Sequence, residues 1–317
     1  MQTNHPLHTR YAPTPSGYLH LGNVYNFIIN RLLAKLSGGT TLLRIDDNDS
    51  ARSNPVFLQD IFETLDFLGL DYETGPASIE DFQKNWSQLL RREDYDKALE
   101  QLANTSDLFA CDCSRSQLAA SGNQNKYNGH CQDLAIPLDQ PEVAWRIKVP
   151  IWTKIEVNDK KLGKTKINIG QQPGSFVVRR KDGIAAYQIC SLVDDLHFGI
   201  NAIVRGSDLL ESTALQIFLA RRLELHSFSE TNFWHHELLR NEQQQKLSKS
   251  TGSLSVKTLK DQGASVAFVY QTFAKWMGLQ KFKNVQTFLE LLRDIQESKN
   301  VNHWIFDPTK LQNPNNE

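Results

Sequence analysis

The chain has 317 residues, 40% of them apolar, so it can bury a sizeable core and is long enough for two domains or for one with a large insertion. Its net charge of −1 gives no global sign of a nucleic-acid partner, and four cysteines do not make a disulfide scaffold in a chain of this length. No stretch resembles a signal peptide or a membrane span, so we expect a cytoplasmic protein with no membrane partner.

The first seventy residues alternate between strand and helix patterns. A short strand is expected at 8–12, and a β-branched, apolar run predicts a buried strand at 40–46. Between them, a loop stiffened by prolines leads into an amphipathic helix that ends near Lys35. A second helix begins at Pro55 and stops at Gly69. This order predicts a βαβ unit and a parallel sheet.

The middle of the chain changes character twice. Helices are expected to continue over 79–103, and 105–140 is then rich in Ser, Asn, Gln, Gly and Cys, which is typical of an irregular insertion. Residues 143–180 alternate as strands do. The α/β pattern returns from 184 onward with a strand-like "NAIVRG" and an amphipathic helix after Ser212.

The fold class predicted from these patterns is α/β. We expect a Rossmann-type parallel-sheet nucleotide-binding domain that is split by a metal-stapled insertion and followed by a helical C-terminal region with a polar tail. The predicted domains are 1–104 and 183–240 for the two halves of the catalytic domain, 105–182 for the insertion and 241–317 for the C-terminal region.

The stretch "HLGN" stands where the first predicted helix begins. An open helix N-terminus attracts phosphate, because its backbone N–H groups and its dipole favour negative charge. His20 and Asn23 would lie beside such an anion, and Gly22 would allow it a close approach. Taken alone, a His and an Asn near a helix start are more often a cap and a surface residue.

The loop "QKLSKSTGS" carries Lys246, Ser248 and Lys249. Two ammonium groups on a Ser- and Gly-rich loop suit the neutralisation of a departing polyphosphate. An isolated loop of this composition is also typical of a solvated basic turn.

Together, in this order, the two motifs resemble the HxGH-type and KMSKS-type motifs of the class I aminoacyl-tRNA synthetases. The blocks "RYAPTPSGYLHLGN", "LLRIDDND", "AYQICSLVDD", "VRGSDLLESTALQ" and "KLSKS" look like successive parts of the glutamyl-tRNA synthetase catalytic core, from residue 10 to about residue 250. The resemblance implies catalytic roles for His20, Asn23 and Lys249. It implies an ATP site, with Mg²⁺ on the phosphates, formed by His20, Gly22, Asn23, Lys246, Ser248 and Lys249.

The resemblance also implies a glutamate site. It comprises Arg10, Tyr11, Ala12, Pro13, Thr14, Asp46, Tyr187 and Arg205. Guanidinium groups bind a carboxylate bidentately and cannot lose their charge, which favours glutamate over glutamine. Tyr187 also fits a core position, and Arg205 also fits a structural ion pair.

Asp46 departs from the family pattern, which usually has Glu at this position. This carboxylate is expected to hold the α-ammonium group of the substrate. Aspartate keeps the charge but is one methylene shorter, so its reach to the amino group is in question.

The predicted insertion contains three of the four cysteines. Chemistry alone favours His130 as a further zinc ligand, because imidazole binds Zn²⁺ more commonly than phenolate, although its neighbour Cys131 makes joint ligation awkward. The resemblance implies instead one structural zinc on Cys111, Cys113, Tyr127 and Cys131. Three cysteines that are close by chance remain the alternative. Cys190 lies in an apolar run and is expected in the core.

Only about seventy residues follow the second motif, including predicted helices at 264–277 and 287–295. This shortness, with the cysteine insertion, is similar to the glutamyl-queuosine tRNA(Asp) synthetases. The resemblance implies ATP-dependent activation of L-glutamate to glutamyl-adenylate and transfer to queuosine in the anticodon of tRNA(Asp). The implied partners are ATP, L-glutamate and tRNA, and we expect a monomer.

Three other interpretations of the function stay open. They are a compact glutamate–tRNA ligase that charges the tRNA 3′ end, a catalytically idle paralogue that binds tRNA or nucleotide, and a small-molecule adenylyltransferase. Lys154, Lys160, Lys161, Lys164 and Lys166 could follow a tRNA backbone, although a solvated hairpin is the favoured interpretation of this stretch.

Overall fold

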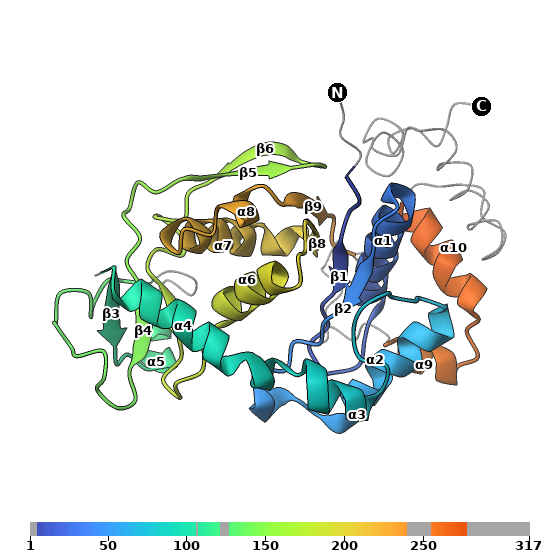
Figure 1. Cartoon of the computed structure of the whole chain (residues 1–317), viewed down its shortest axis with the longest axis horizontal. Coiled ribbons are helices and arrows are strands. Elements are labelled where there is room, and N and C mark those ends of the chain that lie inside the picture. The colour runs from blue at the N-terminus through green and yellow to red at the C-terminus, as the bar shows by residue number, and fades with distance from the viewer. Residues whose placement is uncertain (1–4, 106, 121–126, 240–254, 278–317) are drawn as a thin grey trace. The chain divides into compact units, whose positions relative to one another are not determined.

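The computed structural model describes residues 5–105, 107–120, 127–239 and 255–277 (Figure 1). Its contacts divide the chain into two units, each assembled from segments that are far apart in the sequence. The first unit comprises Met1–Trp86, Ala202–Ser207 and Trp234–Glu317, and the second comprises Ser87–Asn201 and Asp208–Phe233. The functional domain boundaries expected at 104, 182 and 240 stay a prediction.

A strand–helix–strand unit forms the centre of the first unit. β1 (Thr9–Tyr11) pairs in parallel with β2 (Thr41–Leu43), and Arg10 lies opposite Leu42. α1 (Leu21–Ser37) connects the two strands and ends at Gly38, whose positive φ of 69° suits glycine. Both strands are shorter than the predicted runs. The predicted parallel βαβ arrangement is confirmed.

Further helices and strands complete the first unit. They are η1 (Ser50–Arg52), α2 (Pro55–Leu68), α3 (Ile79–Asp81), η2 (Phe82–Trp86), β8 (Ala202–Gly206), the last residues of β9 (Asn232–His236), α9 (Val256–Asp261) and α10 (Val266–Trp276). Hydrophobic side chains of α1, α2, α9 and α10 pack with those of β1 and β8 into one buried cluster that includes Tyr11, Ile45 and Phe273.

The second unit contains a three-stranded antiparallel sheet, several helices and a hairpin, one strand of which also pairs in parallel with β9 through Asp159 and Phe233. In the sheet, β4 (Ala144–Ile147) lies between β3 (Leu108–Cys111) and β7 (Phe176–Arg179). β5 (Ile155–Asp159) and β6 (Gly163–Ile167) form the hairpin. These strands confirm the β pattern predicted for 143–180. The other elements are η3 (Gln88–Arg91), α4 (Arg92–Ala103), α5 (Arg115–Ala120), α6 (Tyr187–His197), η4 (Ser207–Leu209), α7 (Leu210–Arg222) and α8 (His226–Ser229).

A fully buried carboxylate joins three helices of the second unit. Asp194 on α6 accepts hydrogen bonds from Arg91 Nε and Nη2 at 2.8 and 2.9 Å, from the Tyr95 hydroxyl at 2.8 Å and from Gln88 Nε2 at 2.9 Å. A buried charge is tolerated only when it is paired and hydrogen-bonded, and Asp194 meets both conditions. Within the block "AYQICSLVDD", Asp194 therefore has a structural role, because it holds three helices together.

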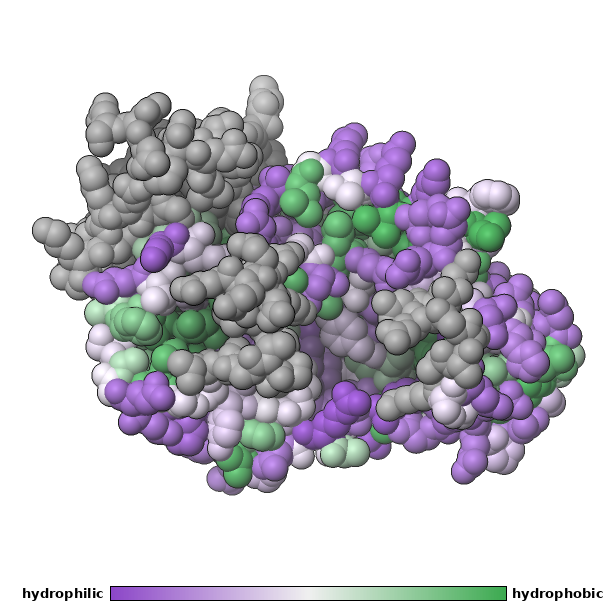
Figure 2. Space-filling model, turned by 180° about the vertical axis from the view of Figure 1, so that it is seen from behind, coloured by the Kyte–Doolittle hydropathy of each residue, from purple (hydrophilic) through white to green (hydrophobic). Residues whose placement is uncertain are grey.

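Hydrophilic side chains cover much of the face drawn in Figure 2, and hydrophobic ones gather in smaller patches among them. Within the described ranges, none of the helices combines the length and the apolar character that crossing a lipid bilayer requires.

Candidate active site and metal centre

The N-terminus of α1 is held by a reciprocal cap. His20 is the N-cap residue, and its Nδ1 accepts a hydrogen bond from the Asn23 N–H at 3.4 Å. The Asn23 side-chain oxygen accepts in turn from the His20 N–H at 3.2 Å. With Nδ1 as acceptor, the neutral ring carries its proton on Nε2. No acidic residue lies in the first turn of this helix, so its positive end remains suited to an anion.

Gly22 is required beside this cap. A Cβ atom at this position would lie 2.9 Å from Cε1 and 3.0 Å from Nδ1 of His20, which is closer than side chains approach one another. Any other residue would therefore push the imidazole out of its place. Steric crowding by His20 therefore explains why "HLGN" has a glycine at position 22.

The segment before His20 is fixed from two sides. The Leu19 N–H donates to Oδ2 of Asp60 on α2 at 2.9 Å, and the Leu19 carbonyl accepts from the Val256 N–H at 2.8 Å. Asp60 is only 4% exposed, and burial is the main reason why its pKa is raised above the usual value. The start of α1 is therefore anchored by main-chain hydrogen bonds to two other elements.

Part of the predicted glutamate site gathers where β1 and β2 end. Beyond the strands, the ladder continues, because the Asp46 N–H donates to the Pro13 carbonyl at 2.9 Å. The buried Arg10 guanidinium donates through Nη1 to the carbonyl of Val204 at 3.3 Å, next to the buried Arg205 on β8. Ligands of parallel sheets bind at the carboxyl ends of the strands, where Ala12, Thr14 and Asp46 follow β1 and β2.

Asp46 already has a strong partner. The Arg44 side chain donates through Nε to Oδ1 at 2.7 Å and through Nη2 to Oδ2 at 3.1 Å, and both side chains are largely buried. Such a bidentate pair fixes the carboxylate in one orientation. An α-ammonium group at Asp46 would therefore share this carboxylate with Arg44.

The Tyr11 side chain points into the core. It is completely buried, and its hydroxyl donates to the Asp71 carbonyl at 3.2 Å. Only the main chain of Tyr11 is left for a ligand. Tyr187 is the first residue of α6 in the second unit and is 44% exposed, so it does not occupy the core position considered as an alternative. Lys246, Ser248 and Lys249 lie outside the described residues.

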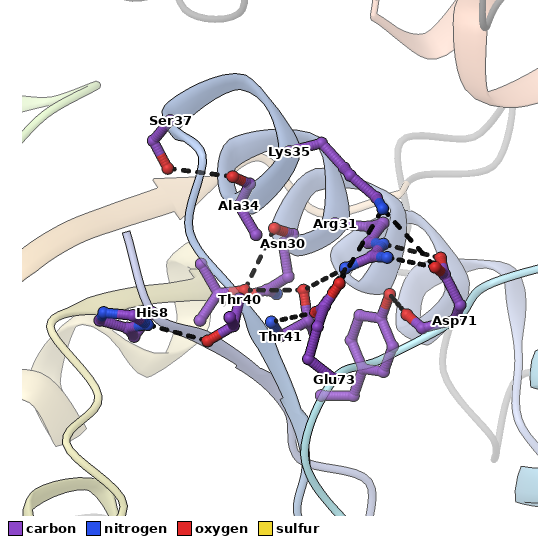
Figure 3. A network of polar contacts seen from close by, with 12 residues as sticks. His8, Asn30, Arg31, Ala34, Lys35, Ser37, Thr40, Thr41, Asp71 and Glu73 are labelled. Atoms are coloured by element: carbon purple, nitrogen blue, oxygen red, sulfur yellow. Dashed lines mark hydrogen bonds and ion pairs between the residues drawn. The ribbon is translucent and has the colours of Figure 1, made fainter. Parts of the chain in front are cut away.

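A polar network fixes the body of α1 (Figure 3). The buried Arg31 donates through Nε to Oδ1 of Asp71 at 2.8 Å and through Nη1 to both carboxylate oxygens of Glu73, at 2.8 and 2.7 Å. Glu73 also accepts from the Thr41 N–H at 2.9 Å. Burial alone would raise the pKa of both carboxyls, but the hydrogen bonds and charge of Arg31 outweigh it, and both pKa values lie below the usual range.

The three cysteines of the insertion come together in the second unit. The Sγ atoms of Cys111, Cys113 and Cys131 all lie within 4.8 Å of one another, and the last two are 3.3 Å apart. A tetrahedral zinc ion with Zn–S bonds of about 2.3 Å needs sulfurs about 3.8 Å apart, so the cluster fits such an ion. None of the three is in a disulfide.

Tyr127 lies at the same cluster, and His130 does not join it. The Tyr127 hydroxyl accepts from the Cys131 N–H at 2.7 Å and is within hydrogen-bonding reach of the thiols of Cys111 and Cys131. His130 is exposed and is not among the residues whose ligand atoms converge in the described part of the chain. The arrangement favours Tyr127 over His130 as the fourth ligand.

Arg146 on β4 supports this cluster. Its guanidinium lies 4.0 Å from the centroid of the Tyr127 ring, and its Nη1 donates to the Ser175 carbonyl at 3.0 Å. Burial would raise the pKa of the Cys111 thiol, but the hydrogen bond and charge of Arg146 outweigh this effect, and the pKa lies below its usual value. A nearby cation favours the thiolate form that binds metal.

Sequence reasoning missed Arg44, Asp60 and Arg146. Asp60 had a local signal, since an acidic residue on the buried side of an otherwise apolar helix needs a hydrogen-bond donor. Arg44 and Arg146 stand in strand patterns. Arg44 had a local signal, because residues two apart in an extended chain share a face and Asp46 is its partner. Only the folded chain brings Arg146 to Tyr127.

Known proteins resemble this chain over most of its length. Residues 6–313 match the family described as tRNA synthetases class I (E and Q), catalytic domain. The chain is 32% identical over 323 residues to glutamate–tRNA ligase 2 of Halorhodospira halophila, a match that covers 96% of this chain and 64% of that relative. It is 35% identical over 254 residues to the glutamyl-Q tRNA(Asp) synthetase of Dechloromonas aromatica, covering 78% of this chain and 80% of that relative.

A solved structure also resembles this chain. The crystal structure of glutamate-tRNA synthetase from Elizabethkingia anophelis matches with a TM-score of 0.66 and 28% identity, over 78% of this chain and 53% of that one. The chain thus spans 64% of the length of the Halorhodospira ligase and 53% of the Elizabethkingia synthetase chain. The resemblance found in the sequence motifs is confirmed: the chain belongs to the class I tRNA synthetases of the E and Q group, through their catalytic domain.

Proposed function

We propose that this protein activates L-glutamate with ATP and transfers the glutamyl group to a tRNA. A glutamate α-carboxylate oxygen attacks the α-phosphorus of ATP. The bond from that phosphorus to the bridging oxygen breaks, and pyrophosphate leaves. The observation that carries this proposal is that one unit contains both an acid-free helix N-terminus capped by His20 and the buried arginines Arg10 on β1 and Arg205 on β8.

Each group has a role that follows from its chemistry. The α1 N-terminus and the Nε2 proton of His20 stabilise charge on the transferring phosphoryl group. Lys249 follows the leaving pyrophosphate, and Arg10 and Arg205 select the side-chain carboxylate of glutamate. Mg²⁺ accompanies the ATP phosphates as part of the substrate. Asp46, held by Arg44, receives the α-ammonium group.

The cysteine cluster binds one zinc ion in a structural role. Cys111, Cys113, Tyr127 and Cys131 supply three thiolate sulfurs and one phenolate oxygen, and all four residues belong to the second unit. A closed site of four protein ligands leaves no position for a substrate, which is typical of structural zinc.

The proposed acceptor is queuosine in the anticodon of tRNA(Asp). This finer assignment is supported by the name of the Dechloromonas relative and by a 36% identity over 243 residues to the glutamyl-Q tRNA(Asp) synthetase of Pseudomonas aeruginosa strain PAO1. An anticodon loop offers unstacked bases that a protein can bind individually. The comparable identity to the Halorhodospira glutamate–tRNA ligase keeps 3′-end charging as the second candidate.

Glutamate-dependent exchange of pyrophosphate into ATP tests the activation step, with and without tRNA. We expect exchange with glutamate and none with glutamine. Lys249→Ala should lower the rate by roughly 10²- to 10³-fold, as for the loss of one preorganised charge contact in the transition state. Lys257→Ala, an exposed lysine of α9, is the matched control. Absence of exchange under both conditions would support the idle paralogue.

The acceptor test compares tRNA(Asp) with and without queuosine. We expect radiolabelled glutamate to attach only to the queuosine-bearing tRNA, and the label to stay with the anticodon fragment, not the 3′-terminal fragment, after ribonuclease cleavage. Efficient charging of unmodified tRNA(Glu) at its 3′ end would instead identify the protein as a compact glutamate–tRNA ligase.

A further inference from the structure

The β5–β6 hairpin carries a local charge that the whole chain does not. Residues 150–170 contain five lysines and two acidic residues, a net charge of +3, although the chain as a whole has a net charge of −1. One of the two acids, Asp159, is buried and accepts hydrogen bonds from the N–H groups of Lys161 and Leu162. The exposed part of the hairpin is therefore strongly basic.

The strand register places two of these lysines, Lys164 and Lys166, on one side of the hairpin. Ile155 and Val157 are buried, so the residues between them face outward. Lys166 lies opposite Glu156, and Lys164 lies opposite Asn158, which puts both lysines on this outward face of the hairpin. The ion pair between Lys164 and Glu156 is long, at 3.8 Å, and its lysine is 76% exposed, so it holds the lysine weakly.

An exposed tryptophan stands at the open end of the same hairpin. Trp152 is 80% exposed, in a turn closed by the Thr153 N–H, which donates to the Pro150 carbonyl at 2.9 Å. The Gly170 N–H donates to the Thr153 carbonyl at 3.1 Å, so this turn packs beside the chain that leaves β6. Trp152 therefore stands on a short turn that main-chain hydrogen bonds fix at the start of the hairpin.

We propose that this surface, formed by Trp152, Lys154, Lys164 and Lys166, binds tRNA. Lysines neutralise backbone phosphates, and an exposed indole offers a flat face on which an unpaired base stacks. Lysines on an edge strand also discourage edge-to-edge aggregation, but that purpose gives no reason to expose a large aromatic ring beside them. That the ligand of this surface is a tRNA rests on the proposed function.

Direct binding tests the surface separately from catalysis. The probe is a fluorescein-labelled tRNA(Asp) transcript, measured by anisotropy over a series of salt concentrations. Trp152→Ala should weaken binding by about 5- to 100-fold with little change in salt dependence, because it removes a stacking partner. Trp152→Phe keeps an aromatic face and should retain most of the affinity.

The lysine test uses a matched pair in the same unit. Lys166→Ala should weaken binding and lower the slope of log affinity against log salt concentration by about 1, as for one lost phosphate contact. Lys97→Ala removes the same charge from an exposed position on α4 and should leave both quantities unchanged.

Several outcomes separate this proposal from the proposed function. If wild type and all variants bind the transcript equally, or if wild type does not bind it, the surface is not a tRNA site, whatever the pyrophosphate exchange shows. Increased self-association of Lys166→Ala with unchanged tRNA affinity would assign the lysines to edge protection instead. Lost tRNA binding in Trp152→Ala and Lys166→Ala supports the surface even if wild type shows no exchange.

Discussion

The start of α1 and the cysteine cluster are stabilised by different means. The start of α1 rests on the large hydrophobic cluster of the first unit, and its loop is tied by hydrogen bonds to Asp60 and Val256. The described buried residues of the cysteine cluster are only Phe109, Cys111, Tyr127 and Cys131. A site on a large core is preorganised before its ligand binds, whereas a site with a small core depends on a cross-link such as a metal ion.

Removing a zinc ligand should give the largest effect. Cys111→Ser should lose the zinc ion, and the insertion should unfold at a lower temperature, because metal-binding free energy contributes directly to its stability. Metal analysis and thermal unfolding before and after chelation measure both effects. Cys190→Ser, a core cysteine of α6, is the matched control and should keep its zinc. Freshly purified wild-type protein without zinc would contradict the assignment.

In the first unit, the largest loss is expected at Arg31. Arg31→Met should lower the free energy of unfolding by about 3 kcal/mol, because it removes charged hydrogen bonds to Asp71 and Glu73. Lys35→Met removes an exposed charge near the same carboxylates and should cost less than about 0.5 kcal/mol. Urea unfolding of both variants provides the comparison.

The Arg31 effect should also depend on pH. The pKa values of Asp71 and Glu73 lie below their usual range, so the folded state releases these protons more readily than the unfolded state. Their stabilisation is complete above the ordinary carboxyl pKa values and is lost as pH falls through the lowered ones. The difference between wild type and Arg31→Met should therefore shrink below about pH 4. A pH-independent difference would mean that packing, not charge, is lost.

A smaller loss is expected at Asp60. Asp60→Ala should cost about 2 kcal/mol, because it leaves the buried Leu19 N–H without its acceptor. Asp60→Asn keeps a hydrogen-bond acceptor but removes the buried negative charge. Burial raises the pKa of Asp60, which means that the charged carboxylate destabilises the folded state, so at pH 7 the variant should be at least as stable as wild type. Its advantage should disappear as pH falls through the raised pKa, where Asp60 becomes neutral. Equal losses in both variants would exclude this role for the hydrogen bond.

The smallest effect is expected at Arg146. Arg146→Met should weaken zinc binding by about tenfold, because the guanidinium beside Cys111 and over Tyr127 favours the metal-binding forms of these ligands. Competition with a chromophoric chelator measures the affinity. Arg179→Met is the matched control, since Arg179 stacks on Trp145 at 4.7 Å in the same sheet and should not change zinc affinity. Similar losses in both variants would indicate a general effect on the sheet.

The sequence by itself determined the local features of this protein. Apolar periodicity predicted α1, the β-branched run at 40–46 predicted β2, and the order of the elements predicted the parallel βαβ unit. The motifs around His20 and Cys111 were also visible, since residue type and spacing are local properties. Such features need only the covalent chain and its short-range preferences.

Tertiary structure decided which side chains meet. Asp60 lies forty-one residues from Leu19 along the chain, yet its carboxylate anchors the start of α1. Folding also turned the Tyr11 side chain into the core and brought Tyr127 rather than His130 to the cysteines. Spacing in sequence carries no direct record of such partners, because burial and hydrogen-bond satisfaction are settled only when distant segments pack together.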